Sequence, residues 1–282
     1  KTGNITVKLP DSTDLDAKHQ VTVIVTDHKK APQQGKNVAV KGDLGQSAAG
    51  KTDKNGELTV PEVEQTERHG VYIVGYTDGT FGPSRSMTRA EAAAIFARLL
   101  AEKNGDTIST AANTKFADIP AHAWYSGYVK YLSNNGITYG KSKTVFAPND
   151  AIARAEFTTM AVRFFDVYGS GDAEIMEQFS GFNDVSSGYW AAEYIKYAAL
   201  HGWINGYGDG SCHADREINR AEVVTIVNRL LGREADEDYI ADNLRKLNTF
   251  PDVSRKHWAY YAVMEAANAH TAVLGESEGW SK

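Results

Sequence analysis

Three arginines are placed where they could bind an anion. Each of Arg89, Arg154 and Arg220 is followed by Ala-Glu and then by an apolar run. Thr88 and Glu91 have the spacing of a capping box, which predicts that Arg89 is the first residue of a helix. A cation at this end costs about 0.3–1 kcal/mol, because the unpaired N–H groups of the first turn carry a partial positive charge.

A bound carboxylate would reverse that balance. The guanidinium fork and the backbone N–H groups could hold the carboxylate together, and a charge-assisted hydrogen bond contributes about 1.5–3 kcal/mol. The sequence therefore predicts an anion receptor at the start of each of these helices.

The three arginines belong to an internal repeat. They lie 65 and 66 residues apart, each comes 14 residues after a glycine, and each precedes a second arginine by nine residues. The glycines are Gly75, Gly140 and Gly206, and the second arginines are Arg98, Arg163 and Arg229. Another block repeats as FADIPAHAW, FNDVSSGYW and FPDVSRKHW, beginning at Phe116, Phe182 and Phe250. Self-similarity at a fixed period predicts a protein built of repeated supersecondary units.

The repeat leaves a second interpretation of the first arginines open. Each could pair with a nearby aspartate, such as the one in each Phe-x-Asp block, and tie the repeats together, and the two roles can coexist. The second arginines lie near the helix C-terminus, where the helix dipole alone explains a cation. No ligand role is therefore expected for them.

Glycine-rich turns precede the Arg-Ala-Glu segments and could complete a sugar site. The glycines would let a sugar approach the backbone, and four polar side chains could read its hydroxyl groups. These candidates are Asp78, Thr80, Asp209 and Ser211. Turn formation explains the Asp-Gly pairs equally well. Trp124, Trp190 and Trp258 could stack on a sugar, but helical spacing favours a place in the core.

The three copies are unequal. The first has the turn GYTDGTFGP and Thr88 as a cap. The second, GKSKTVFAPNDAIARAE, lacks the Asp-Gly pair and has Ala153 at the capping position, although two lysines add cations. The third, GYGDGSCHADREINRAE, has Cys212 in place of an aromatic residue, but Asn219 can still cap. These differences rank the sites first, third and second.

The composition limits the possible partners. The 282 residues carry a net charge of −6, with a sequence pI near 5.8, which disfavours binding to nucleic acid. No apolar run is long enough to span a membrane, and the lone Cys212 excludes an internal disulfide. No metal-spaced histidine cluster or phosphate loop occurs, so neither a metal nor a cofactor is expected. The first residue is not methionine, which suggests a trimmed segment with any secretion signal upstream.

Residues 1–64 differ from the rest of the chain. Segments such as NITVKLP and HQVTVIVTD alternate apolar and polar residues, and Asn55-Gly56 is a strong hairpin signal. These features predict a small all-β sandwich. The segment GKTDKNGELTVP resembles the bacterial Ig-like or prealbumin-like modules of surface proteins, and a spacer role is expected.

From Gly70 onward the sequence predicts helices of two alternating kinds. The motifs Phe-x-Asp-Val, Trp-Ala, Gly-Tyr-x-Asp-Gly-Thr-Phe and Thr-Arg-Ala-Glu resemble the S-layer homology family. The resemblance implies an all-α pseudo-trimer of three repeats around a central helix bundle. We expect the domain at 65–282, with units at about 70–115, 116–181 and 182–249, and with 250–274 completing the first unit.

The resemblance also implies a function. Members of this family attach bacterial surface proteins non-covalently to secondary cell-wall polysaccharide, often through a pyruvate-ketal sugar, and the Thr-Arg-Ala-Glu arginine is the implied ligand contact. The repeated residue types supply neither a nucleophile nor a general base. We therefore expect an extracellular binding module at the cell wall rather than an enzyme. The alternative is a structural protein that self-assembles into a surface lattice and has vestigial sugar grooves.

The repeats are expected to close into a ring. The first Arg-Ala-Glu helix has no Phe-x-Asp block ahead of it, whereas the block at Phe250 has no Arg-Ala-Glu helix after it. A half-repeat cannot bury its apolar stripe alone. We predict that the helix near Trp258 packs beside helix 89–100 and that residue 70 lies near residue 272.

Overall fold

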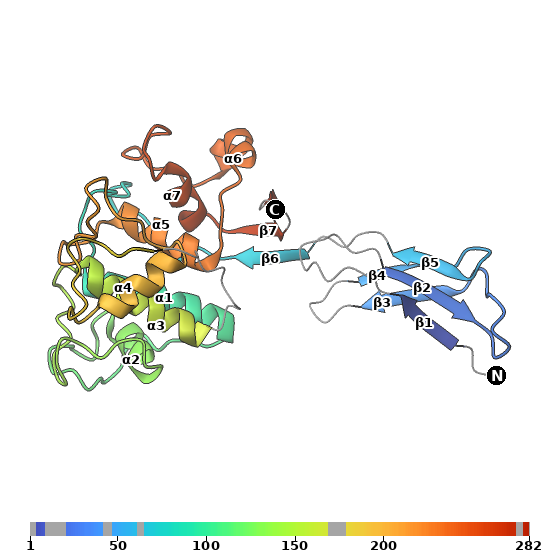
Figure 1. Ribbon diagram of the computed structural model, residues 1–282, viewed down its shortest axis with the longest axis horizontal. Coiled ribbons are helices and arrows are strands. Elements are labelled where there is room, and N and C mark those ends of the chain that lie inside the picture. The colour runs from blue at the N-terminus through green and yellow to red at the C-terminus, as the bar shows by residue number, and fades with distance from the viewer. Residues whose placement is uncertain are drawn as a thin grey trace. The chain divides into compact units, whose positions relative to one another are not determined.

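Two separate units make up the chain (Figure 1). The computed structural model describes residues 4–8, 21–41, 47–60, 65–168, 179–274 and 279–281. One unit comprises residues 1–69 together with 270–282, and the other comprises residues 70–269. The described part of the first unit contains strands, and that of the second contains helices.

Short antiparallel strands form the first unit. They are β1 (Asn4–Lys8), β2 (Val21–Thr26), β3 (Asn37–Lys41), β4 (Ser47–Lys51), β5 (Glu57–Val60), β6 (Gln65–His69), β7 (His270–Leu274) and β8 (Gly279–Ser281). Their sheets have the orders β1-β2-β5, β3-β4 and β6-β7-β8. Gly56 has a φ of 72° and closes a tight turn by donating its N–H to the Asp53 carbonyl at 3.0 Å. The flanking strands β4 and β5 pair with different neighbours, so this turn does not join the two strands of a hairpin. The sandwich itself stays a prediction.

Strands β6 and β7 bring together the chain segments that lead into and out of the helical unit. The pairing runs from Gln65 opposite Leu274 to His69 opposite His270. The expectation that the chain near residue 70 meets the chain near residue 272 is confirmed.

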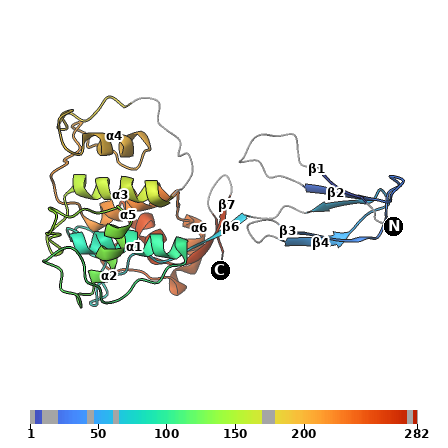
Figure 2. The ribbon, with the colours of Figure 1, turned by 90° about the horizontal axis from the view of Figure 1, so that it is seen from below.

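Helices of two kinds alternate in the second unit (Figure 2). They are α1 (Arg89–Asn104), α2 (Ser126–Asn134), α3 (Arg154–Tyr168), α4 (Ala192–Leu200), α5 (Arg220–Leu231), α6 (Glu237–Asn243) and α7 (Tyr260–Ala267), with one 3₁₀ turn (Leu244–Lys246). Helices α1, α3 and α5 begin at the arginine, as predicted. Helix α2 packs on α1, α4 on α3 and α7 on α5, while α3 also contacts α1 and α5.

The sequence around each arginine explains where its helix starts. Thr88 Oγ1 accepts the Glu91 N–H at 3.2 Å, and the Glu91 carboxylate accepts the Thr88 N–H at 2.8 Å. This capping box is repeated at the start of α5. At α3, Ala153 offers no side-chain acceptor, but its N–H still donates to Glu156 at 3.1 Å. A left-handed glycine ends α1 and α5.

The three helices that begin at arginines are buried on nearly every face. Phe96 of α1 lies 5.3 Å from Phe157 and 5.0 Å from Phe164 of α3, measured between ring centroids. A helix that is apolar all round belongs in the interior of a fold. The central helix bundle implied by the family resemblance is therefore present.

Backbone hydrogen bonds close the repeats into a ring. Met87 N–H donates to the Ile218 carbonyl at 3.0 Å, Ile218 N–H to Ile152 at 3.0 Å, and Ile152 N–H back to Met87 at 2.9 Å. All three side chains are completely buried. Each residue lies two positions before an arginine, so the same position of every repeat meets at the centre.

The way in which the last helix joins this ring differs from the prediction. Helix α7 packs on α5, so its predicted packing beside α1 is wrong. Each Trp-block helix instead packs on the Arg-Ala-Glu helix that precedes it in the chain. The Phe-x-Asp block crosses to the first repeat: Phe250 lies 5.3 Å from Phe81, and Asp252 accepts the Phe81 N–H at 2.9 Å.

Candidate functional site

Each arginine of the Arg-Ala-Glu motif is buried and reaches into the next repeat. Arg89, Arg154 and Arg220 have exposed fractions of 4%, 5% and 4%. Each guanidinium faces the motif glutamate of the following repeat, in the pairs Arg89–Glu156 (2.9 Å), Arg154–Glu222 (3.7 Å) and Arg220–Glu91 (3.7 Å). The three pairs form a closed circle. The arginines therefore tie the repeats together, with glutamate in place of the expected aspartate.

The Phe-x-Asp aspartates fold the glycine turns instead. Asp252 accepts two backbone N–H groups of the first turn, those of Phe81 at 2.9 Å and Gly82 at 2.7 Å. The equivalent bonds join Asp118 to Phe146 and Ala147, and Asp184 to Cys212 and His213. Each aspartate thus fixes the turn whose carbonyls and side chains surround an incoming arginine.

The free N–H groups expected at the helix starts are occupied. Arg89 N–H donates to the Asp150 carbonyl and Ala90 N–H to the Pro148 carbonyl, both at 2.9 Å. Equivalent bonds run from α3 to Arg216 and Ala214 and from α5 to Arg85 and Pro83. Because ring closure uses these donors, the structure does not form the predicted anion seat between arginine and helix end.

Each repeat glycine lies against a phenylalanine ring. An added Cβ would lie 2.5 Å from Phe250 at Gly75, 2.4 Å from Phe116 at Gly140 and 2.5 Å from Phe182 at Gly206. The approach of the ring explains why glycine is needed at this position in all three repeats. The sequence interpretation had assigned this space to a sugar.

The polar candidates in the glycine turns bond to each other. Asp78 Oδ1 accepts the Thr80 N–H at 2.9 Å and the Thr80 hydroxyl at 2.6 Å. Asp209 Oδ1 accepts the Ser211 N–H at 3.0 Å and the Ser211 hydroxyl at 2.5 Å. In each case the side-chain and backbone hydrogen bonds lower the pKa of the aspartate. These pairs form Asx turns, which is the turn-forming role considered for them.

A cavity of about 200 Å³ lies beside the first glycine turn. It is lined by residues of the first repeat, by Arg220 of the third repeat, and by Trp124, which precedes α2 in the second. Its polar and aromatic side chains are those of Tyr76, Glu91, Arg98, Trp124 and Arg220, and Gly75 and apolar side chains complete the wall. Asp78 and Thr80 do not line it.

Arg220 is the buried cation of this cavity. Its Nε donates to the Phe81 carbonyl at 2.8 Å and its Nη2 to the Val74 carbonyl at 2.7 Å. Its guanidinium lies 4.6 Å from the Tyr76 ring centroid, and burial lowers its pKa. The structure places Arg89, which the sequence associates with this turn, at the second turn, where Nε donates to the Phe146 carbonyl at 2.7 Å.

Sequence reasoning missed Arg98 as a cavity residue. Glu91, Ala94, Ile95 and Arg98 all line the cavity, and their spacing of three, four and seven residues places them on one face of α1. That spacing was available in the sequence. The sequence does not show that Arg220 of the third repeat lies at the first site, because this position depends on ring closure.

The three tryptophans are exposed, so the expected core role is wrong. Trp124, Trp190 and Trp258 have exposed fractions of 54%, 57% and 64%. Each lies two residues before the start of its helix, at Ser126, Ala192 and Tyr260. They are therefore outside the regular helical stripe from which burial was predicted.

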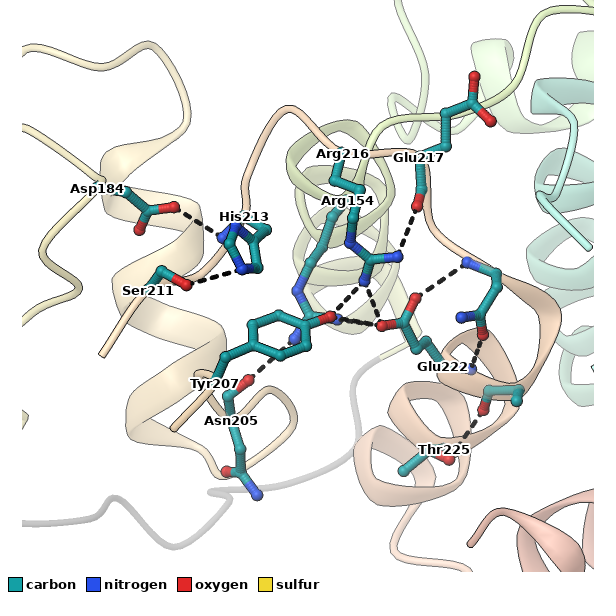
Figure 3. A network of polar contacts seen from close by, with 12 residues as sticks. Arg154, Asp184, Asn205, Tyr207, Ser211, His213, Arg216, Glu217, Glu222 and Thr225 are labelled. Carbon is teal, nitrogen blue, oxygen red and sulfur yellow. Dashed lines mark hydrogen bonds and ion pairs between the residues drawn. The ribbon is translucent and has the colours of Figure 1, made fainter. Parts of the chain in front are cut away.

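At the third site, Tyr207, Glu222 and Arg154 correspond to Tyr76, Glu91 and Arg220 of the first, and Figure 3 shows their polar contacts. Tyr207 donates its hydroxyl to Glu222 at 2.6 Å, and Arg216 donates to both of these residues. Arg154 Nη2 donates to the Asn205 carbonyl at 3.0 Å. Burial opposes ionisation of Glu222, but hydrogen bonds from Asn219, Tyr207 and Arg216 lower its pKa overall. The phenol of Tyr207 and the carboxylate of Glu222 are therefore already engaged by Arg216.

The second site departs furthest from the other two. Lys141 takes the place of the tyrosine and pairs with Asp150 at 2.8 Å. Arg163 lies between two tyrosines, 4.7 Å from the Tyr139 ring centroid and 5.0 Å from that of Tyr194. This site therefore lacks the tyrosine–glutamate contact of the other repeats, and its last place in the ranking stays a prediction.

Three stretches of the chain match the S-layer homology domain: residues 59–93, 115–158 and 181–224. The helical part of the chain belongs to the S-layer homology family. The second and third matches each include a Phe-x-Asp block, a glycine turn and the start of an Arg-Ala-Glu helix. The first S-layer homology repeat lacks its block in sequence, and Phe250 and Asp252 supply it through ring closure.

Related proteins belong to bacterial cell surfaces. Cell surface glycoprotein 1 of Acetivibrio thermocellus is 33% identical over 74% of this chain and 9% of its own length. The cellulosome-anchoring protein of the same organism is 29% identical over 82% of this chain and 49% of its own. The surface-layer 125 kDa protein of Lysinibacillus sphaericus is 32% identical over 56% of this chain and 13% of its own. The chain thus spans half or less of each of these relatives.

These similarities place the chain outside the cell, at the cell wall, as the sequence predicts. Among the residues that the structure describes, no helix is both long and apolar enough to cross a membrane.

Proposed function

We propose that the helical unit anchors a bacterial surface protein non-covalently by binding secondary cell-wall polysaccharide in the cavity beside the first glycine turn. The observation that carries the proposal is the lining of this cavity, in which two arginines, one glutamate and two aromatic rings meet. Apolar walls with a few convergent charged groups suit an anionic sugar. The names of the anchoring and surface-layer relatives support the same role.

The chemistry of the cavity favours a sugar that carries a carboxylate. Arg98 and Arg220 line the cavity together with a single carboxylate, that of Glu91, so the local charge is positive. An aromatic face, from Trp124 or Tyr76, can take the C–H face of a sugar ring. A pyruvate ketal adds a carboxylate to such a ring and pairs with a guanidinium through charge-assisted hydrogen bonds.

The other two sites are proposed to bind more weakly. At the third site, a ligand must compete with Arg216 for Glu222 and Tyr207. At the second, the Lys141–Asp150 pair replaces the tyrosine. Residues assigned from the sequence contribute to these two sites. Arg89 and Arg154 are the buried cations, and the glycine turns contain Gly140, Gly206, Asp209 and Ser211.

The remaining assignments complete the proposal. Residues 1–64 are proposed to be an Ig-like spacer, and residues 65–282 the binding domain. The domain acts as a non-enzymatic module, since the positions that repeat along its length serve ring closure and ligand binding.

The test is titration calorimetry with purified wall polysaccharide that carries pyruvate ketals, and with the same polymer after mild acid has removed them. We expect binding to the first polymer and at least a tenfold loss with the second, the equivalent of about 1.4 kcal/mol. Absence of binding to both, together with ordered self-assembly of the chain, would support the lattice alternative.

A further inference from the structure

We infer that Arg98, and not an arginine of the Arg-Ala-Glu motif, receives the carboxylate of the ligand at the first site. The inference rests on the proposed function, because it concerns the same cavity and the same class of ligand. It assigns specificity for an acidic sugar to a residue to which the sequence gave no ligand role.

The first step is that Arg220 is already engaged. Its Nε and Nη2 donate to two backbone carbonyls, its Nη1 faces Glu91 at 3.7 Å, and rings lie against its guanidinium. A bidentate carboxylate needs two parallel N–H groups from one fork. Arg220 could present such a fork only by giving up contacts that hold the first and third repeats together.

The second step is that Arg98 is available. Its side chain is half-buried and lines the cavity. Its guanidinium lies 5.1 Å from the centroid of the Tyr128 ring. Among the residues that the structure describes, the guanidinium of Arg98 has no hydrogen-bond acceptor and no carboxylate partner. A stacked arginine keeps its in-plane donors free, because the contact uses only the face of the guanidinium.

The third step is the position of an aromatic surface beside this cation. Trp124 lines the same cavity and is more than half exposed. A sugar ring on Trp124 would place a ring-borne carboxylate at Arg98, while Arg220 contributes a buried positive charge behind it. The ligand class is therefore a pyranose that carries a carboxylate, as a pyruvate ketal or as a uronic acid.

The equivalent arginines lack this combination. Arg163 donates to the Tyr194 hydroxyl at 3.2 Å and is flanked by a second tyrosine. Arg229 is exposed, and the position that corresponds to Tyr128 is occupied by Ala262. Among the described residues, an arginine stacked on one tyrosine beside a cavity and an exposed tryptophan occurs only at the first site.

The experiment compares Arg98→Gln with Arg163→Gln, its matched control in the second repeat. Calorimetry uses the methyl glycoside of a pyruvylated N-acetylhexosamine and the same glycoside without pyruvate. We expect Arg98→Gln to lose about 10- to 100-fold in affinity for the pyruvylated probe. Its affinity for the neutral probe should stay at the wild-type value, and Arg163→Gln should match the wild type with both.

A second variant and a second probe separate the possible explanations. Arg98→Lys keeps the charge but loses the fork, so its affinity should lie between those of the wild type and Arg98→Gln. A glucuronic acid glycoside in place of the pyruvylated probe distinguishes a general carboxylate receptor from one shaped for the ketal. Thermal unfolding of each variant establishes that the fold is kept.

The outcomes distinguish this inference from the proposed function. Wild-type affinity for the pyruvylated probe in Arg98→Gln would overturn the inference and leave the proposed function standing. An equal loss for both probes would overturn it too, because a carboxylate receptor does not act on a neutral sugar. Absence of wild-type binding to both probes and to the wall polymer would overturn both proposals.

Discussion

Replacing Arg220 by alanine should destabilise the helical unit far more than replacing Arg98. Arg220→Ala removes a buried guanidinium that bonds to the carbonyls of Phe81 and Val74 and faces Glu91. Removal of one partner of a buried ion pair costs about 3–5 kcal/mol. Because the side chain of Glu91 is 24% exposed and the pair is 3.7 Å apart, the lower end applies. We therefore expect a loss of about 3 kcal/mol in the free energy of unfolding.

The loss converts into a measurable temperature shift. For a unit of about 200 residues, 1 kcal/mol lowers the melting temperature by about 2–4 °C, so Arg220→Ala should melt about 6–12 °C below the wild type. Far-ultraviolet circular dichroism at the helical signal follows the helical unit. Arg98→Ala is the control, and it should lower the free energy of unfolding by no more than about 1 kcal/mol, because it removes a stacking contact with Tyr128.

Arg154→Ala provides a graded comparison. Within the described part of the chain, Arg154 Nε has no hydrogen-bond acceptor, whereas Nε of both Arg89 and Arg220 donates to a carbonyl. The cost of burying that donor is already present in the wild type. Arg154→Ala should therefore lower the melting temperature less than Arg220→Ala.

Equal melting temperatures for Arg220→Ala and Arg98→Ala would refute the assignment of Arg220 as the tie between the first and third repeats.

Three further predictions follow from the turns and the exposed rings. Gly206→Ala should destabilise the helical unit by about 1–3 kcal/mol in thermal unfolding, because its Cβ would lie 2.5 Å from a phenylalanine ring; Gly208→Ala, with open space around the new Cβ, should match the wild type. Trp124→Ala should weaken binding of wall polysaccharide in calorimetry and Trp258→Ala should not, and equal losses would contradict a single main site. Burial and a hydrogen bond to an aspartate raise the pKa of Tyr189 to about 12. Its protonated form therefore stabilises the fold fully below pH 10, and the contribution is lost as the pH rises through 12; phenolate absorbance should show a late-titrating tyrosine that Tyr189→Phe removes.

Local sequence signals predicted the helices well. Capping boxes are formed by residues three positions apart, so Thr88 and Glu91 are sufficient to define the start of α1. The period of the repeat likewise predicted three equivalent helices and a closed ring. The helix starts depend on residues close together in the chain, and the number of helices and the ring follow from the number of repeats. A single sequence shows both.

The site could not be assembled from the sequence in the same way. Glu91 takes its arginine from residue 220, and the turn at Gly75 takes its phenylalanine from residue 250. Such partners are fixed by which repeat follows which around the ring. The role of Trp124 was predicted wrongly for a different, local reason: its helix begins two residues later than the apolar pattern suggests.

The circular exchange of arginines constrains how the copies can diverge. The second repeat has a lysine where the other turns have tyrosine and an alanine where the other helices have a side-chain cap, yet it retains Arg154 and Glu156. Glu156 holds the arginine of the first repeat, and Arg154 enters the third. A copy whose own groove is no longer useful must therefore keep its motif for the benefit of both neighbours. Each Arg-Ala-Glu motif supports sites that belong to other copies, so the presence of the motif in a copy is no measure of the activity of the groove beside it.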